Sequence, residues 1–210
     1  MSYSKLETNS AIGNYYLLSA ANPRIDLAYD TGAQDFFRQR FSVYVVRELF
    51  RPENDALIVK SKQEQTNYGL SWQPMWVTEG EGFSYGLKLG AKAATIVSEL
   101  PTTFTVNGDV ATRYSAEGGV CFNWFGQTVT KFPLNVGLEL LYSQGLLDNS
   151  VITYRNGFIY RFSFEFDFKK KTLFSGWNIK GFYSFEDIEN SYSHFVDKEL
   201  GLTINKVFTF

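Results

Sequence analysis

The sequence predicts an all-β protein: an antiparallel, up-and-down transmembrane β-barrel, with ten strands preferred and eight as the alternative. Three observations carry this prediction. Apolar and polar residues alternate with a period of two in one segment after another, which indicates strands with one apolar face. No run of about 20 apolar residues occurs, so an apolar spanning helix is not expected. Short and long connections alternate after Tyr29, as expected when turns gather at one end of a barrel and loops at the other.

Length and composition limit the other possibilities. The 210 residues are expected to form one domain, 1–210, because barrels of this length commonly fold as a unit. The net charge of −2, with both signs spread along the chain, argues against nucleic acid as a partner. The single cysteine, Cys121, excludes an internal disulfide and a multi-cysteine metal site. No metal and no cofactor are expected.

Residues 1–35 have the weakest pattern. One short strand is expected within residues 10–20, and another at Ile25–Tyr29 before the turn-rich Asp30–Ala33. The alternative is a tail or plug followed by one strand, with residues 1–10 as a disordered N-terminal tail. No apolar core follows Met1, so no signal peptide is recognised, and an exported protein would be present here as a mature sequence with an added Met.

The middle of the chain alternates more clearly. We expect four strands between residues 37 and 124, namely Phe37–Val45, Tyr68–Trp76, Phe83–Ala93 and Val110–Trp124. Their connections are predicted to be the long loop Arg47–Gln65, the tight turn Thr78–Gly82 and the long loop Ser98–Asp109. Pro74 lacks an N–H for the ladder, so the second of these strands should be distorted around it.

The C-terminal part continues the alternation. Four more strands are expected, at Phe132–Tyr142, Tyr154–Phe168, Trp177–Phe185 and Leu200–Phe210. The predicted connections are a turn at Gly126–Lys131, a loop at Gln144–Ser150, a turn at Lys169–Thr172 and a last loop at Asp187–Asp197. The last strand falls on the side of the short turns.

The segment Leu200–Phe210 resembles the C-terminal targeting strand of bacterial outer-membrane β-barrels. Apolar residues occupy Leu200, Leu202, Ile204, Phe208 and Phe210, and the sequence finishes with Phe. In that family the strand is read by the barrel-assembly machinery, so the resemblance implies outer-membrane lipid and this machinery as partners. It also implies location in the outer membrane of a Gram-negative bacterium.

The aromatic face of each strand is expected to point outward. The rings are too many and too large for the interior of a small closed barrel, and the opposite face combines Gly and Ser with charges, as a narrow polar lumen requires. A soluble lipid-binding barrel of the lipocalin type would invert this arrangement and is the alternative. The residues predicted to face lipid are Phe158, Tyr160, Phe162, Phe164, Phe166, Trp177, Phe208 and Phe210.

Charges of both signs are expected inside the barrel. They can select small solutes at a constriction, or pair with one another and fill the lumen; barrels of eight to ten strands have little free bore, which favours filling. The predicted lumen residues are Arg38, Arg40, Lys88, Lys92, Arg113, Glu117, Glu139, Arg161, Glu165, Lys180 and Glu199.

Catalysis has one weak candidate, His194, which is the only histidine. It is expected in the last loop near Ser191 and Ser193, with Asp197 or Glu199 to orient it as a base. The His-x-Ser spacing of barrel phospholipases and deacylases is absent, because Val196 occupies that place. A solvated loop histidine is the more common explanation.

The leading hypothesis is therefore a non-enzymatic outer-membrane barrel with a narrow, charged, largely filled lumen and a structural or surface-binding role through its loops. Its loop-bound partner is unknown. The alternatives are a narrow porin-like channel for small polar solutes, an outer-membrane lipid-modifying enzyme and the soluble lipid-binding barrel.

Overall fold

The structure, a computed structural model, describes residues 2–10, 13–31, 36–52, 63–80, 82–98, 110–126, 133–148, 154–167, 177–190 and 194–206. Within these ranges the chain forms one antiparallel β-sheet of eleven strand segments. None of the described segments is a helix of the length and apolarity needed to cross a bilayer.

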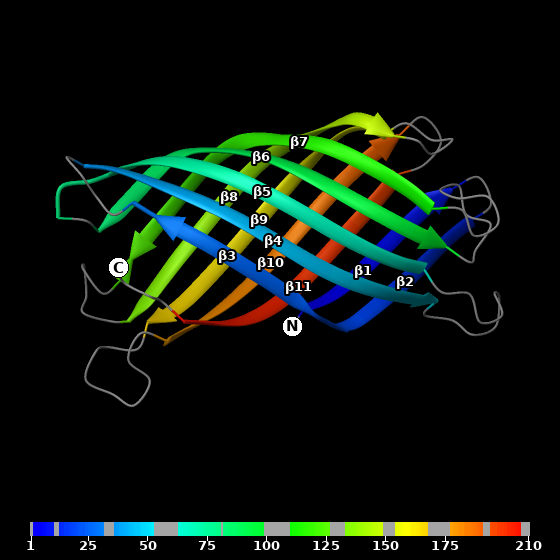
Figure 1. Cartoon of the computed structure of the whole chain (residues 1–210), viewed down its shortest axis with the longest axis horizontal. Helices are drawn as coiled ribbons and strands as arrows, with labels where there is room; N and C mark the ends of the chain where they lie inside the picture. The colour runs from blue at the N-terminus through cyan, green and yellow to red at the C-terminus, as the bar shows by residue number, and fades with distance from the viewer. Residues whose placement is uncertain are drawn as a thin grey trace.

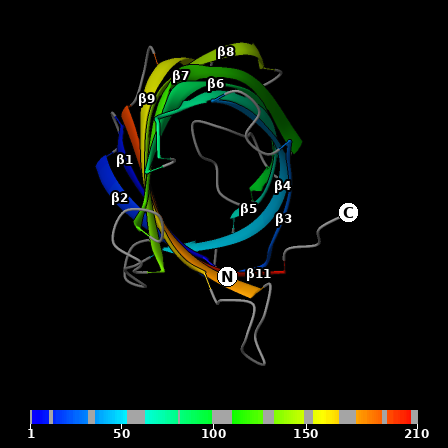
Figure 2. The same cartoon turned by 90° about the vertical axis from the view of Figure 1, so that its left-hand side faces the viewer.

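Successive strands pair along the sheet, and the first strand pairs with the last, so that the sheet curls into a barrel (Figures 1 and 2). The strands are β1 Ser2–Ser10, β2 Gly13–Asn22, β3 Arg24–Asp30, β4 Phe37–Pro52, β5 Gln63–Val77, β6 Phe83–Ser98, β7 Val110–Phe125, β8 Leu134–Asp148, β9 Tyr154–Asp167, β10 Trp177–Asn190 and β11 His194–Lys206.

Ten strand positions surround the barrel axis, because β2 and β3 share one position. Leu17 and Leu18 of β2 pair with Pro52 and Arg51 at the C-terminal end of β4. The residues of β3, Arg24–Asp30, pair with the earlier part of the same strand, from Val46 back to Arg40. Pro23, which has no N–H to donate, separates the two segments. The ten-stranded antiparallel barrel is thus confirmed, although the strands predicted at residues 10–20 and 25–29 occupy one position and not two.

The tenth position belongs to β1. Its residues pair with β11 on one side, from Ser2 opposite Gly201 to Asn9 opposite His194, and with β2 on the other. The prediction of a disordered tail at residues 1–10 is therefore wrong. Serine, lysine and asparagine gave this segment a weak alternation, and only its two neighbouring strands make it extended.

Several strands are longer than their alternation indicated. β10 continues to Asn190 and β11 begins at His194, so the predicted loop Asp187–Asp197 is wrong. Likewise β4 runs to Pro52 and β5 starts at Gln63, inside the predicted loop Arg47–Gln65. These extensions lie at the end of the barrel where β11 begins. The outer face of the strands need not be apolar there, so the sequence no longer alternates with a period of two.

The distortion expected at Pro74 is present. The ladder between β5 and β6 runs from Gln63 to Trp72 and resumes at Met75, without pairs at Gln73 and Pro74. The ladder between β5 and β4 continues through Pro74, which faces Gln39 there. The missing proline N–H thus interrupts one side of the strand only.

The distribution of apolar residues is the reverse of that in a soluble domain. Large apolar side chains lie exposed on the outside, whereas the buried residues of the described part comprise thirteen polar or charged residues against nine apolar ones. Four of the outward rings on β9, from Phe158 to Phe164, are between 37% and 56% exposed. Their neighbours Arg161 and Ser163 lie on the inner face and are half-buried.

Candidate functional site

The interior of the barrel is polar, and its hydrogen bonds cross the lumen. Gln73 Nε2 on β5 donates to Glu139 Oε1 on β8 at 3.0 Å, although two strands separate β5 from β8 in the sheet. Lys92 on β6 meets Glu186 on β10, although three strands separate β6 from β10 in the sheet. Contacts of this kind pass through the inside of the barrel, which assigns these side chains to the lumen.

Glu139 is the centre of the first cluster. Its Oε2 atom lies 2.7 Å from Lys88 Nζ and 2.9 Å from Arg161 Nη1, while its Oε1 atom accepts the Gln73 amide. The side chains of Lys88, Glu139 and Arg161 are 10%, 19% and 24% exposed. One carboxylate therefore neutralises two cations that have little access to solvent.

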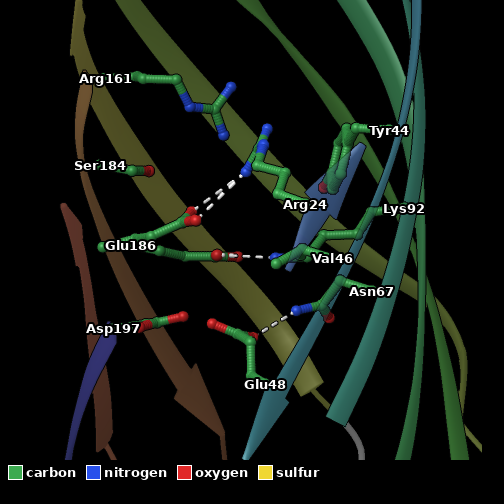
Figure 3. A pocket seen from close by; sticks show the side chains of 11 residues that line it. Arg24, Tyr44, Val46, Glu48, Asn67, Lys92, Arg161, Ser184, Glu186 and Asp197 are labelled. Carbon is green, nitrogen blue, oxygen red and sulfur yellow. Dashed lines mark hydrogen bonds and ion pairs between the residues drawn. The ribbon is translucent and has the colours of Figure 1, made fainter. Parts of the chain in front are cut away.

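A second cluster surrounds a small cavity, drawn in Figure 3. Lys92 Nζ lies 2.9 Å from Glu186 Oε2, and Arg24 Nη1 lies 3.2 Å from Glu199 Oε1. The Arg24 guanidinium also rests 4.7 Å from the centre of the Tyr44 ring, an aromatic contact that suits a planar cation. The cavity has a volume of about 20 Å³, which is room for about one ordered water.

The lower side of this cavity, as Figure 3 is oriented, is acidic. Glu48 Oε2 accepts a hydrogen bond of 2.7 Å from Asn67 Nδ2, and Asn67 Oδ1 accepts one of 2.8 Å from Gln65 Nε2. Asp197 points toward Glu48 from the opposite wall (Figure 3). Its buried Oδ1 atom has no hydrogen-bond partner among the described residues.

The remaining predicted lumen residues occupy inner-face positions outside the two clusters. Arg38 lies 3.5 Å from Asp30, and Glu165 accepts a hydrogen bond from the Asn178 amide. The other four are half-buried: Arg40, Arg113, Glu117 and Lys180. The structure thus brings Lys88, Lys92, Glu139, Arg161 and Glu199 into the ion pairs of the two clusters and pairs Arg38 with Asp30, and the other five lie elsewhere along the strands.

The residues predicted to face lipid that are described lie on the outside. Phe158, Tyr160, Phe162, Phe164, Phe166 and Trp177 are all exposed. Phe208 and Phe210 lie outside the described residues.

Sequence reasoning missed Arg24, Glu48 and Asp197. Arg24 follows Pro23 in the poorly patterned N-terminal part, but its alternation with Ile25 would have placed it on the inner face. Glu48 and Asp197 were assigned to loops, because the extended ends of β4 and β11 lack an apolar outer face.

The candidate for catalysis is not in a loop. His194 begins β11, opposite Asn9 of β1 and Glu189 of β10 in the ladders. Its side chain, together with Ser191 and Ser193, lies outside the described part of the chain. Cys121 is buried, with its Sγ atom 3.6 Å from the Leu87 carbonyl oxygen. The described residues include no group of three or more His, Cys, Asp or Glu side chains able to hold a metal ion.

Comparison with known proteins yields weak structural likenesses. No protein-family model and no curated protein sequence matches the chain. The translocator domain of the autotransporter NalP from Neisseria meningitidis is similar at 8% identity and a TM-score of 0.45, over 96% of this chain and 85% of that one. The transport unit of the autotransporter AIDA-I from Escherichia coli is similar at 9% identity and a TM-score of 0.40, over 99% of this chain and 88% of that one. The NanC porin is similar at 9% identity and a TM-score of 0.33, over 96% of this chain and 98% of that one.

Proposed function

We propose that this chain is an outer-membrane β-barrel of a Gram-negative bacterium whose lumen is filled by paired charges. Its role is structural or surface-binding, and it acts neither as an open pore nor as an enzyme. The observation on which the membrane location chiefly rests is the reversed polarity of the barrel, with apolar side chains outside and ion pairs inside. In water such an outer surface would drive aggregation, whereas lipid accepts it.

Two aromatic girdles support the same proposal. The four tryptophans, Trp72, Trp76, Trp124 and Trp177, lie toward the end of the barrel at which β11 finishes. Tyr68, Tyr114 and Tyr142 lie toward the opposite end. On β7, Tyr114 and Trp124 are ten residues apart, which corresponds to roughly 25 Å along the membrane normal for a strand tilted by about 40°. That is the height of the apolar band of outer-membrane barrels.

Location is tested by cell fractionation and gel mobility. We expect the protein in the outer-membrane fraction, with an electrophoretic mobility that changes on heating because the folded barrel resists detergent. Recovery of a monomer in buffer without detergent would instead support the soluble lipid-binding barrel.

The filled lumen is tested by planar-bilayer recording of the refolded protein. We expect no detectable conductance from the refolded protein, because the ion pairs around Glu139 and beside Lys92 cross the lumen. Stable unitary current steps would overturn this part of the proposal and favour the narrow channel for small polar solutes.

The partners follow from the proposed location. Outer-membrane lipid contacts the apolar outer surface, and the C-terminal segment Leu200–Phe210, which includes the end of β11, is the element that barrel-assembly machinery would read. A loop-bound partner belongs to the surface-binding role proposed here, and residues 53–62 of the predicted loop Arg47–Gln65 lie outside the described part of the structure.

A further inference from the structure

The cavity of the second cluster has more carboxylates in its walls than cations. The carboxylates that line it are Glu48, Glu186, Asp197 and Glu199. The cations that line it are Arg24, Lys92 and Arg161. With all of these groups ionised, three positive and four negative charges would leave the walls with a net charge of −1. An unbalanced charge is costly in a place with little access to water, so the excess needs a counter-charge.

Asp197 is the carboxylate that is left without a cation. Glu186, its direct neighbour on β10 in the ladder, lies 2.9 Å from Lys92 Nζ. Glu199, two residues further along β11, lies 3.2 Å from Arg24 Nη1. Asp197 itself makes no ion pair with a described residue, and its Oδ1 atom is buried without a hydrogen-bond partner. The two cations nearest to Asp197 in the cavity wall are thus already paired with other acids.

Glu48 is the group that Asp197 faces. It reaches the cavity from β4, on the opposite wall, and is only 2% exposed. Its Oε2 atom accepts the 2.7 Å hydrogen bond from Asn67 Nδ2, and its other oxygen points toward the Asp197 carboxyl group (Figure 3). Two carboxyl groups that share a desolvated place do not both ionise readily, because each negative charge opposes the other. The geometry therefore favours one proton for the two groups.

The other titratable groups around the pair are already paired or balance one another. Arg161 of β9 lies 2.9 Å from Glu139, and the Tyr44 phenol of β4 is uncharged at neutral pH. From β7 come one cation and one carboxylate, Arg113 and Glu117. The buried residues described on β1, β2 and β5 are all uncharged. None of these groups supplies the missing positive charge to the pair.

A metal ion fits this place less well than a proton. Ca²⁺ takes about six to eight oxygen ligands, and Mg²⁺ usually keeps several of its waters. The cavity of about 20 Å³ has room for about one water. The described residues also form no group of three or more His, Cys, Asp or Glu side chains that could hold a metal. A proton needs no such volume and carries the single charge that is required.

We propose that Glu48 and Asp197 share one proton and thereby form a pH-sensitive lock between β4 and β11 at the end of the lumen where β11 begins. The protonated carboxyl group donates a hydrogen bond, and the other carboxylate accepts it. When the proton leaves to bulk water, two negative charges face each other and the two walls repel. The lock concerns the inside of the barrel, so it goes beyond the proposed membrane role and does not depend on it.

The lock is tested by urea-induced unfolding in lipid vesicles at a series of pH values. A free carboxyl group loses its proton at about pH 4, so above about pH 5 the unfolded chain holds no proton at either position, whereas the folded pair still holds one. Stability must then fall as the pH rises, because the folded state binds more protons than the unfolded state. The unfolding equilibrium constant should increase about tenfold per pH unit until the pair itself is deprotonated.

Glu48→Gln and Asp197→Asn are the decisive variants. Each puts a neutral amide in place of one carboxyl group, and its N–H can donate to the remaining carboxylate without a proton that titrates. Their unfolding constants should change by less than about twofold per pH unit over the same range. The control Glu64→Gln alters an exposed carboxylate on β5 and should keep the slope of the unmodified protein. Equal slopes in all four proteins would overturn the proposal.

Infrared spectroscopy provides a test on the unmodified protein, which is needed where a variant fails to fold. At about pH 6, where ordinary carboxyl groups are ionised, the folded protein should show the band of a neutral carboxyl group. The band should disappear at high pH and on unfolding. Its absence at every pH above about 5 would overturn the proposal. So would a Ca²⁺ titration that abolishes the pH dependence of unfolding, because a metal ion would then occupy the place of the proton.

Discussion

Glu139 shows how single residues hold the lumen together. Its carboxylate contacts Lys88, Arg161 and Gln73, each from a different strand, so one side chain from β8 links β5, β6 and β9. A charge removed from water is tolerated only while it is paired, and the loss of one partner leaves the others uncompensated.

Glu139→Ala should therefore destabilise the barrel by about 3 kcal/mol, because it leaves two cations unpaired in a largely desolvated place. The measurement is urea-induced unfolding in lipid vesicles, followed by tryptophan fluorescence. The control is Glu64→Ala, which removes the partner of Arg47 in an exposed pair whose side chains are 46% and 64% exposed. Solvent screening limits that loss to below about 1 kcal/mol. Equal losses in the two variants would contradict the role given to Glu139.

Two adjacent glycines on β7 make a second comparison at the residue scale. A Cβ atom at Gly119 would lie 2.1 Å from the Leu140 carbonyl oxygen, a backbone atom that cannot move aside. A Cβ atom at Gly118 would meet Leu89 Cδ2 at 3.6 Å, an ordinary contact. Gly119→Ala should cost about 2 kcal/mol in the free energy of unfolding, and Gly118→Ala should cost clearly less. Urea-induced unfolding in lipid vesicles measures both losses. Equal free energies of unfolding for the two variants would show that β8 can shift away from a Cβ atom at residue 119.

At the scale of one strand, the outer face should respond to charge according to depth. Leu140 lies near the middle of β8 and Leu146 near its end, and both are exposed on the outer face. Leu140→Arg should destabilise by about 2 to 4 kcal/mol and Leu146→Arg by about 0 to 1 kcal/mol, because hydrocarbon surrounds only the first. Unfolding in vesicles measures both. If the two substitutions cost the same, the membrane placement of β8 is wrong.

At the scale of the whole molecule, the proposed filling of the lumen by paired charges predicts that solutes do not pass. The triple variant Lys88→Ala/Glu139→Ala/Arg161→Ala removes both cations together with their shared carboxylate, so that no charge of the cluster is left unpaired. It should show unitary current steps in planar bilayers where the unmodified protein shows none. The control Arg47→Ala/Glu64→Ala removes an exposed ion pair and should stay silent. Silence of the triple variant would mean that other side chains block the lumen.

Local patterns carried much of the sequence prediction. The alternation of rings with charges along Tyr154–Phe168 requires a strand with two unlike faces, whatever it pairs with. The same reasoning correctly predicted the distortion at Pro74, because a missing N–H is a property of the residue itself. It could not find the strand at Ser2–Ser10 or the extended ends near Asn190 and His194, where neither face had to be apolar.

The sequence by itself determined that the chain forms an antiparallel barrel of alternating strands, because a period of two with bulky rings on one face leaves few other ways to bury polar groups. Only the tertiary structure decided which charges pair across the lumen, as Lys92 does with Glu186, and that β2 and β3 share one position. Those facts depend on curvature and on the register between strands distant in the chain, and neither is encoded in the period of a single strand.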